Sequence, residues 1–145
     1  MIDLDNQTTL EINVEQLETI AQTLCKKELE LIITDDQTMQ ELNREHRGKE
    51  GITDVLSFPM DAPFTQHSTF GMPLGSIIIA ASCVKEKAAA FGHTHQDELS
   101  LLFIHGMLHL LGFDHEVDHG EMRRREEEVI KQFNLPKSLI VRTQQ

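Results

Sequence analysis

The chain has 145 residues, enough for one domain around one core, and has no apolar run of about eighteen residues that could span a membrane. Its two cysteines, Cys25 and Cys83, lie far apart, which excludes a disulfide framework and favours a reducing cytoplasm. The formal net charge of -11, from 13 Lys and Arg against 24 Asp and Glu, by itself counts against a polyanionic partner such as nucleic acid.

The N-terminal third is expected to form two strands around one helix. Ile2 and Leu4 indicate a short strand, and residues 29–34 (LELIIT) predict another. Between them, Asn13 and Gln16 form a capping-box pattern at the start of a helix. The apolar residues of this helix recur at the spacing of one helical face: Leu17, Ile20, Ala21 and Leu24.

A second helix and a third strand are predicted next. Asp35 or Asp36 can cap a helix that runs towards His46, and Gly48 can end this helix. Residues 55–58 (VLSF) indicate a short strand, which the following proline stops.

The middle of the chain combines a long connection with strong strand and helix patterns. Residues 61–75 are too many for an ordinary connection, so we expect a functional or mobile loop there. Residues 76–80 (SIIIA) form a β-branched run typical of a buried strand. Residues 81–91 predict a helix that ends at Gly92.

Two further helices are predicted at residues 97–111, ending at Gly112, and at residues 118–133. The second has one apolar side: Met122, Val129, Ile130 and Phe133. Because strands and helices mix without strict alternation, we predict an α+β fold. Residues 1–145 should form a single domain, with a small mixed sheet packed by about five helices.

The stretch HGMLHLLGFDH, residues 105–115, predicts a metal site at a helix C-terminus and the following turn. His105 and His109 lie one turn apart on one helical face. Gly112 can reverse the chain and return His115 as a third ligand. Three imidazoles suit one zinc ion or another late transition metal, and three protein ligands leave a coordination position open, as catalytic sites do.

The same histidine spacing occurs in metzincin proteases, where a glutamate after the first histidine acts as general base. Here that position is Gly106, which cannot take a proton. We therefore interpret the metal as retained and ordinary peptidase chemistry as absent. A further alternative is that the histidines are core residues with satisfied hydrogen bonds.

Several motifs together resemble the YbeY family, bacterial metal-dependent endoribonucleases that mature ribosomal RNA. HGMLHLLGFDH with glycine in second position resembles the family's histidine motif, and residues 42–59 (LNREHRGKEGITDVLSFP) resemble a second family segment. LGSIIIA, and the acidic helix with Met122 and Glu126, also agree with the family. The resemblance extends from about residue 30 to residue 133.

The resemblance implies an α+β domain with a metal, usually zinc, at His105, His109 and His115; nickel is an alternative. It also implies a working role for Arg47, which matches the arginine of the family's R-G-K segment. The implied activity is single-strand-specific cleavage in 16S ribosomal RNA maturation and ribosome biogenesis, with components of the small ribosomal subunit as partners. Ser76 departs from the family, which has aspartate there.

A nuclease mechanism can be outlined from these residues. The metal would bind the scissile phosphate and lower the pKa of its water from 15.7 to about 7. Arg47 would stabilise charge on the phosphorane, whether water or the ribose 2′-hydroxyl attacks. Without the family resemblance, a solvated helix end is the favoured explanation of Arg44, His46, Arg47 and Lys49.

Two other functions remain open. A metallohydrolase of peptide or amide bonds is supported by the histidine spacing and the acidic charge but opposed by Gly106. A noncatalytic ribosome-assembly factor with a structural metal is opposed by the open coordination position. RNA binding requires that the cations of residues 44–49 gather beside the metal, because the chain as a whole is acidic.

Overall fold

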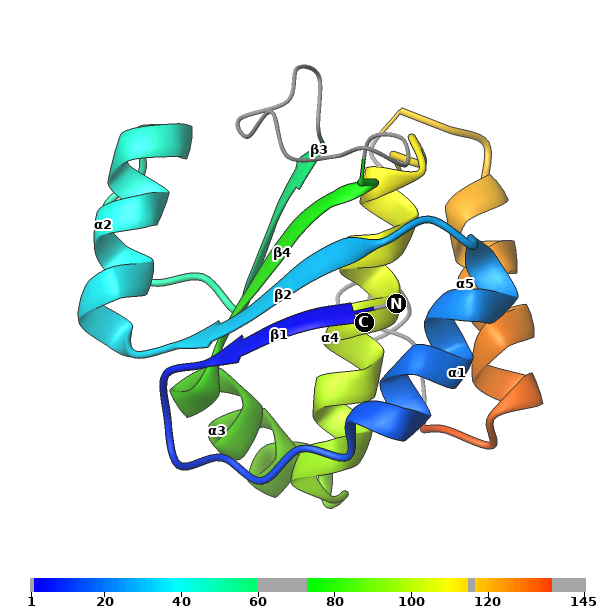
Figure 1. Cartoon of the computed structure of the whole chain (residues 1–145), viewed down its shortest axis with the longest axis horizontal. Helices are drawn as coiled ribbons and strands as arrows, with labels where there is room; N and C mark the ends of the chain where they lie inside the picture. The colour runs from blue at the N-terminus through cyan, green and yellow to red at the C-terminus, as the bar shows by residue number, and fades with distance from the viewer. Residues whose placement is uncertain (1, 60–72, 115–116, 137–145) are drawn as a thin grey trace.

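The computed structural model describes residues 2–59, 73–114 and 117–136. Within these residues one mixed sheet is packed by five helices, as predicted for an α+β domain (Figure 1). The strands are β1 (Ile2–Asn6), β2 (Leu29–Thr34), β3 (Val55–Pro59) and β4 (Gly75–Ala80). The helices are α1 (Val14–Leu24), α2 (Asp36–Arg47), α3 (Ala81–Phe91), α4 (His95–Leu110) and α5 (Glu121–Gln132).

The sheet has the strand order β1-β2-β4-β3, in which β1, β2 and β4 are parallel and β3 is antiparallel to β4. Side chains alternate between its two faces. Leu31 pairs with Ile77 on one face, and the next pair along, Ile32 and Ile78, lies on the other face. The β-branched run of β4 is therefore apolar on both faces, which requires helices on both sides.

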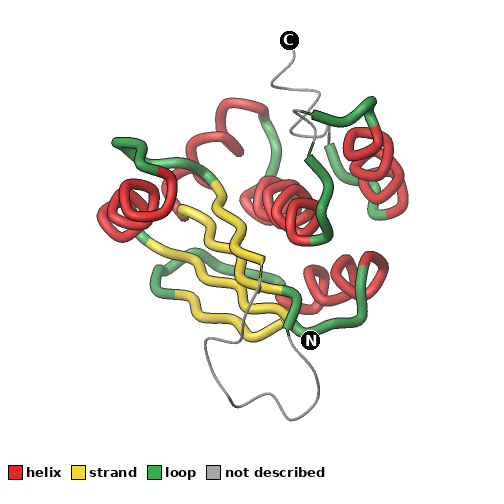
Figure 2. The backbone as a smooth tube through the Cα atoms, turned by 90° about the horizontal axis from the view of Figure 1, so that it is seen from above, coloured by secondary structure: helices red, strands yellow, loops and turns green. Residues whose placement is uncertain are grey.

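The two faces of the sheet are covered unequally. The larger core contains α4 together with apolar residues of α1, α3 and α5 (Figure 2). Helix α2 packs on the opposite face, where Met39 contacts a smaller apolar cluster with Leu56 and Ile78. Helix α4 is buried on most sides because it lies between the sheet and the other three helices. Its histidines are consequently held on a rigid central element.

Local capping explains where α1 and α2 begin and end. The Asn13 side chain accepts a hydrogen bond from the Gln16 N–H, and the Asp35 carboxylate accepts one from the Thr38 N–H. The bond from Thr38 lowers the pKa of Asp35 because it favours the charged carboxylate. Gly48 ends α2 in the left-handed conformation, with φ of 65°. These features confirm Asn13, Asp35 and Gly48 as caps, although the Asn13 N–H donates to Gln96 Oε1 and not to Gln16 as a full capping box requires.

Two predicted helix starts are wrong. Helix α4 begins at His95 rather than residue 97, because Thr94 caps it by accepting a hydrogen bond from the Asp97 N–H. Helix α5 begins at Glu121 rather than residue 118. Asp118 lies in the preceding turn, where its carboxylate accepts hydrogen bonds from two backbone N–H groups that follow it.

The predicted strand starts and ends are close to those observed. β4 starts one residue before the predicted Ser76, and β3 includes Pro59. β3 is an edge strand, where proline is tolerated. Most of the predicted loop 61–75 lies outside the described residues. None of the described helices has the length and apolar character needed to cross a membrane.

Candidate metal centre

Helix α4 brings His105 and His109 together near its C-terminal end. Their Nε2 atoms face each other at 3.2 Å, and both side chains are half-buried. Two ligands of one tetrahedral zinc ion, each at the usual Zn–N distance, lie about 3.3 Å apart. The two imidazoles therefore have the separation that a shared metal ion requires.

The other side of the His105 ring contacts a buried carboxylate. Oε2 of Glu126, on α5, lies 3.3 Å from Nδ1 of His105, and the Glu126 side chain is 0% exposed. A carboxylate at Nδ1 fixes the ring orientation and directs Nε2 towards a metal. Sequence reasoning did not connect Glu126 with His105, although a carboxylate on the apolar side of a helix, between Met122 and Ile130, is a usable signal.

The predicted third ligand, His115, lies outside the described residues. Across residues 2–59, 73–114 and 117–136, no group of three or more His, Cys, Asp or Glu side chains gathers as a metal site. The turn that precedes His115 is described: Gly112 has φ of 98°, and the Phe113 N–H donates to the Leu108 carbonyl. The left-handed Gly112 agrees with the predicted chain reversal, and the three-histidine site stays a prediction.

Gly106 lies where α4 touches the sheet. Its carbonyl accepts a hydrogen bond from Ser57 Oγ at 3.2 Å. A Cβ atom on Gly106 would lie 3.0 Å from Cγ2 of Ile77 and 3.2 Å from Ser57 Oγ. A glutamate at this position would thus be directed into the sheet rather than towards the histidine pair. The close packing of helix on strand gives a second reason why this site lacks the metzincin base.

Arg47 lies at the end of α2 and is exposed. The C-terminal ends of α2 and α4 both lie at the upper edge of Figure 1, on opposite faces of the sheet. No contact between described residues joins Arg47 directly to either histidine. The two parts of the candidate site are instead connected through β3.

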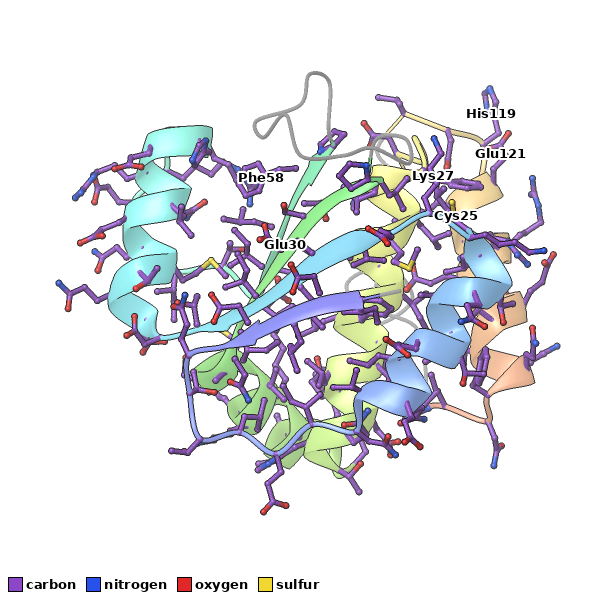
Figure 3. The ribbon with its side chains drawn as sticks, viewed as in Figure 1. Cys25, Lys27, Glu30, Phe58, His119 and Glu121 are labelled. Carbon is purple, nitrogen blue, oxygen red and sulfur yellow. The ribbon has the colours of Figure 1, made fainter. Side chains whose placement is uncertain are left out.

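Strand β3 contacts the two helices through adjacent residues. Ser57 reaches α4 by its hydrogen bond to Gly106, whereas Phe58 lies on the face covered by α2 (Figure 3). The Phe58 ring packs against the ring of His46, with centroids 4.8 Å apart. The strand that follows the R-G-K segment thus positions the end of α2 relative to the histidine helix.

Known proteins resemble the chain over nearly its whole length. The family model described as Endoribonuclease YbeY matches residues 3–134. Endoribonuclease YbeY of Sulfurovum sp. strain NBC37-1 is 61% identical over 142 residues, which cover 98% of this chain and 97% of the relative. The chain belongs to the YbeY family.

Further YbeY relatives and a solved structure extend the comparison. Endoribonuclease YbeY of Sulfurimonas denitrificans is 54% identical over 145 residues, covering 99% of each chain. The solution structure of TM1509 from Thermotoga maritima matches with a TM-score of 0.56 and 26% identity, covering 92% of each chain. The resemblance seen in the two sequence motifs is confirmed, together with the α+β fold.

Asp54, within the TDVLSFP motif of this YbeY chain, braces the start of β3. Its Oδ1 accepts a hydrogen bond from the Val55 N–H at 2.8 Å, its other oxygen pairs with Lys87, and its carbonyl accepts from the Ala80 N–H. Burial raises the pKa of the nearby Cys83 thiol, and the negative charge of Asp54 raises this pKa further. Asp54 therefore has a clear structural role on the α2 side of the sheet.

Ser76, which stands where the family has aspartate, also lies on the α2 side of the sheet. Its hydroxyl donates a hydrogen bond to Oε1 of Glu30 at 2.9 Å. An aspartate at this position would place a second negative charge beside Glu30. The serine thus suits its neighbour, and it faces away from the larger core that contains α4.

A second histidine–carboxylate pair was not anticipated. Nε2 of His93 lies 2.7 Å from Oε1 of Glu98, and Glu98 is 0% exposed. The pair is at the start of α4, opposite the end that carries His105. His119 is exposed beside the start of α5, where its backbone N–H donates to the Glu121 carboxylate (Figure 3).

Proposed function

We propose that this YbeY chain is a metal-dependent, single-strand-specific endoribonuclease that acts in 16S ribosomal RNA maturation. The family and its relatives named Endoribonuclease YbeY support the reaction class. The observation that carries the proposal is the facing pair of Nε2 atoms of His105 and His109, because a separation of 3.2 Å suits two ligands of one ion.

His105, His109 and His115 would hold one zinc ion, or another late transition metal such as nickel. When bound, such an ion supplies Lewis acidity and activates water at neutral pH. Glu126 holds the His105 ring from the side opposite His109, so that the two Nε2 atoms remain aligned. The buried position of α4 limits movement of both rings.

Arg47 would stabilise the negative charge that builds on the phosphorane, since its guanidinium is planar and always protonated. Among the described residues Arg47 has no ion-pair partner and is exposed, whereas Arg123 and Arg125 pair with glutamates of their own helix. Arg47 is therefore available to a phosphate. A ribosomal substrate would place the protein in the cytoplasm, which agrees with the free thiols of Cys25 and Cys83.

The test uses full-length protein as purified, after chelation, and after addition of zinc. Labelled single-stranded RNA, the same RNA as a duplex, single-stranded DNA and casein are the substrates. We expect the metal-loaded protein to cut only single-stranded RNA. Products that end in a 2′,3′-cyclic phosphate would identify the 2′-hydroxyl as nucleophile, and products with a 5′-phosphate would identify water.

Variants separate this activity from a contaminating nuclease. We expect His109→Ala and Arg47→Ala each to lower the cleavage rate by about a hundredfold or more. Matched controls are His95→Ala, an exposed histidine at the other end of α4, and Arg124→Ala, an exposed arginine of α5. Cleavage by both site variants at the parental rate would refute the proposal, and cleavage of casein would support the metallohydrolase alternative.

A further inference from the structure

Two rings form an exposed pair at the end of α2. The His46 ring lies against the Phe58 ring of β3, with centroids 4.8 Å apart and planes at 59°. His46 is exposed and Phe58 is half-buried, so the pair is accessible from solvent. The Phe58 side chain also packs at the margin of the smaller apolar cluster, which holds this ring in place.

Three cations lie near His46 in the sequence. Arg44 and Arg47 are on the same helix as His46, and Lys49 follows the helix end. None of these three cations has an ion-pair partner among the described residues, whereas Lys87, Arg123 and Arg125 do. In a chain with a net charge of -11, unpaired cations beside exposed rings suit a ligand that is both anionic and aromatic.

The end of β3 also lies close to the C-terminal end of α4. A Cβ atom on Gly75 would lie 2.4 Å from the Phe58 carbonyl oxygen and 2.8 Å from Cδ2 of Leu110, the residue after His109. Only glycine allows this approach, since Gly75 has φ of 152° and no side chain. Gly75 therefore lies between the backbone of Phe58 and the side chain of Leu110, the last residue of α4, and is close to both.

We propose that His46 and Phe58 form a stacking platform for one unpaired nucleobase, next to the nucleotide whose phosphate Arg47 contacts. This inference rests on the proposed nuclease function and extends it to recognition of the substrate. The acidic chain repels the phosphates of RNA. Stacking of a base on a ring does not depend on net charge, so it can supply binding affinity despite this repulsion. A base in a duplex is already stacked and paired, so a platform of this kind favours single strands.

Anisotropy measurements can test the platform with the full chain loaded with zinc. The probes are a 2′-O-methyl phosphorothioate decanucleotide, which resists cleavage, and the same backbone with abasic residues throughout. We expect the parent to prefer the base-bearing probe by about tenfold. Phe58→Leu and His46→Gln should each remove most of this preference, while binding of the abasic probe stays nearly unchanged.

The chain offers a matched control. Phe91 stacks on His93 with ring centroids 6.3 Å apart, at the end of α3, and is 52% exposed. Phe91→Leu should keep the parental preference for the base-bearing probe. Leucine at position 58 retains apolar packing and His46 is exposed, so we expect both platform variants to fold, which thermal unfolding will check.

The outcomes separate this inference from the proposed function. Equal binding of both probes by the parent, or an unchanged preference in both platform variants, would overturn the platform. If the parent cuts RNA but shows no base preference, only the platform fails. If it prefers bases but cuts no RNA, only the proposed catalytic function fails.

Discussion

A buried carboxylate contacts the His105 ring on the side away from His109. Burying a charged group is costly unless hydrogen bonds compensate for the lost water. Glu126 is 0% exposed, and its contact with His105 Nδ1 supplies such compensation. Neighbouring glutamates of α5 have a different environment: Glu127 and Glu128 pair with arginines of the same helix at the surface. Adjacent positions of α5 thus place Glu126 against the His105 ring and Glu127 in an ion pair at the surface.

We predict that Glu126→Gln weakens zinc binding by about 10- to 100-fold, because the amide orients and polarises His105 less well than a carboxylate. Competition with a chromophoric zinc chelator measures the affinity, independently of catalysis. Glu127→Gln, which removes an exposed partner of Arg123, is the control and should bind zinc like the parent. Equal zinc affinity in Glu126→Gln and the parent would show that this carboxylate does not support the metal site.

At the scale of secondary structure, α4 depends on its cap as well as on burial. Thr94 Oγ accepts a hydrogen bond from the Asp97 N–H at 3.0 Å, which satisfies one of the unpaired donors of the first turn. The last two turns carry His105 and His109, and Gly112 follows in the left-handed conformation. The helix is therefore defined at both ends by local chemistry, and its middle is defined by packing.

Loss of the Thr94 cap should destabilise the domain. We predict that Thr94→Ala lowers the free energy of unfolding by about 1 kcal/mol. Urea titration followed by circular dichroism measures the change, with Thr9→Ala, an exposed threonine outside the helices, as the control. If Thr94→Ala unfolds at the same urea concentration as the parent, burial alone determines where α4 starts.

At the scale of the whole molecule, charge limits how RNA can bind. The net charge of -11 repels a polyanion, so few phosphates should be contacted. Arg44, Arg47 and Lys49 are close to His46 of the proposed platform in the sequence, and all three are exposed. The binding affinity should therefore come from a small number of phosphate contacts, which salt weakens, and from base stacking, which salt leaves unchanged.

For single-stranded RNA, three phosphate contacts predict a slope of about -2 for log affinity against log salt concentration. Arg47→Ala should make this slope less steep by about 0.7, whereas Phe58→Leu should weaken binding and leave the slope unchanged. Titrations of the cleavage-resistant probe at several salt concentrations measure both slopes. A much steeper slope in the parent would mean that cations elsewhere on the chain contribute most of the phosphate contacts.

Much of the fold could be predicted because its signals are local. The predicted spans of β2 and α3 agree with those observed, since β-branched runs and the glycine that ends α3 act within a few residues. The observed starts of α4 and α5 differ from the predicted ones because Thr94 caps α4 and because Asp118 accepts hydrogen bonds in the turn before α5. The pairing of histidines four residues apart was likewise predictable from helix geometry.

The sequence by itself therefore determined most of the secondary structure, the family and the spacing of the histidine pair, since short sequence patterns encode all three. Only the tertiary structure decided which distant groups complete the site. Glu126 lies 21 residues from His105, and Ser57 lies 49 residues from Gly106. Such contacts depend on how α5 and β3 pack against α4, and packing is set by the shape of the whole core rather than by any local pattern.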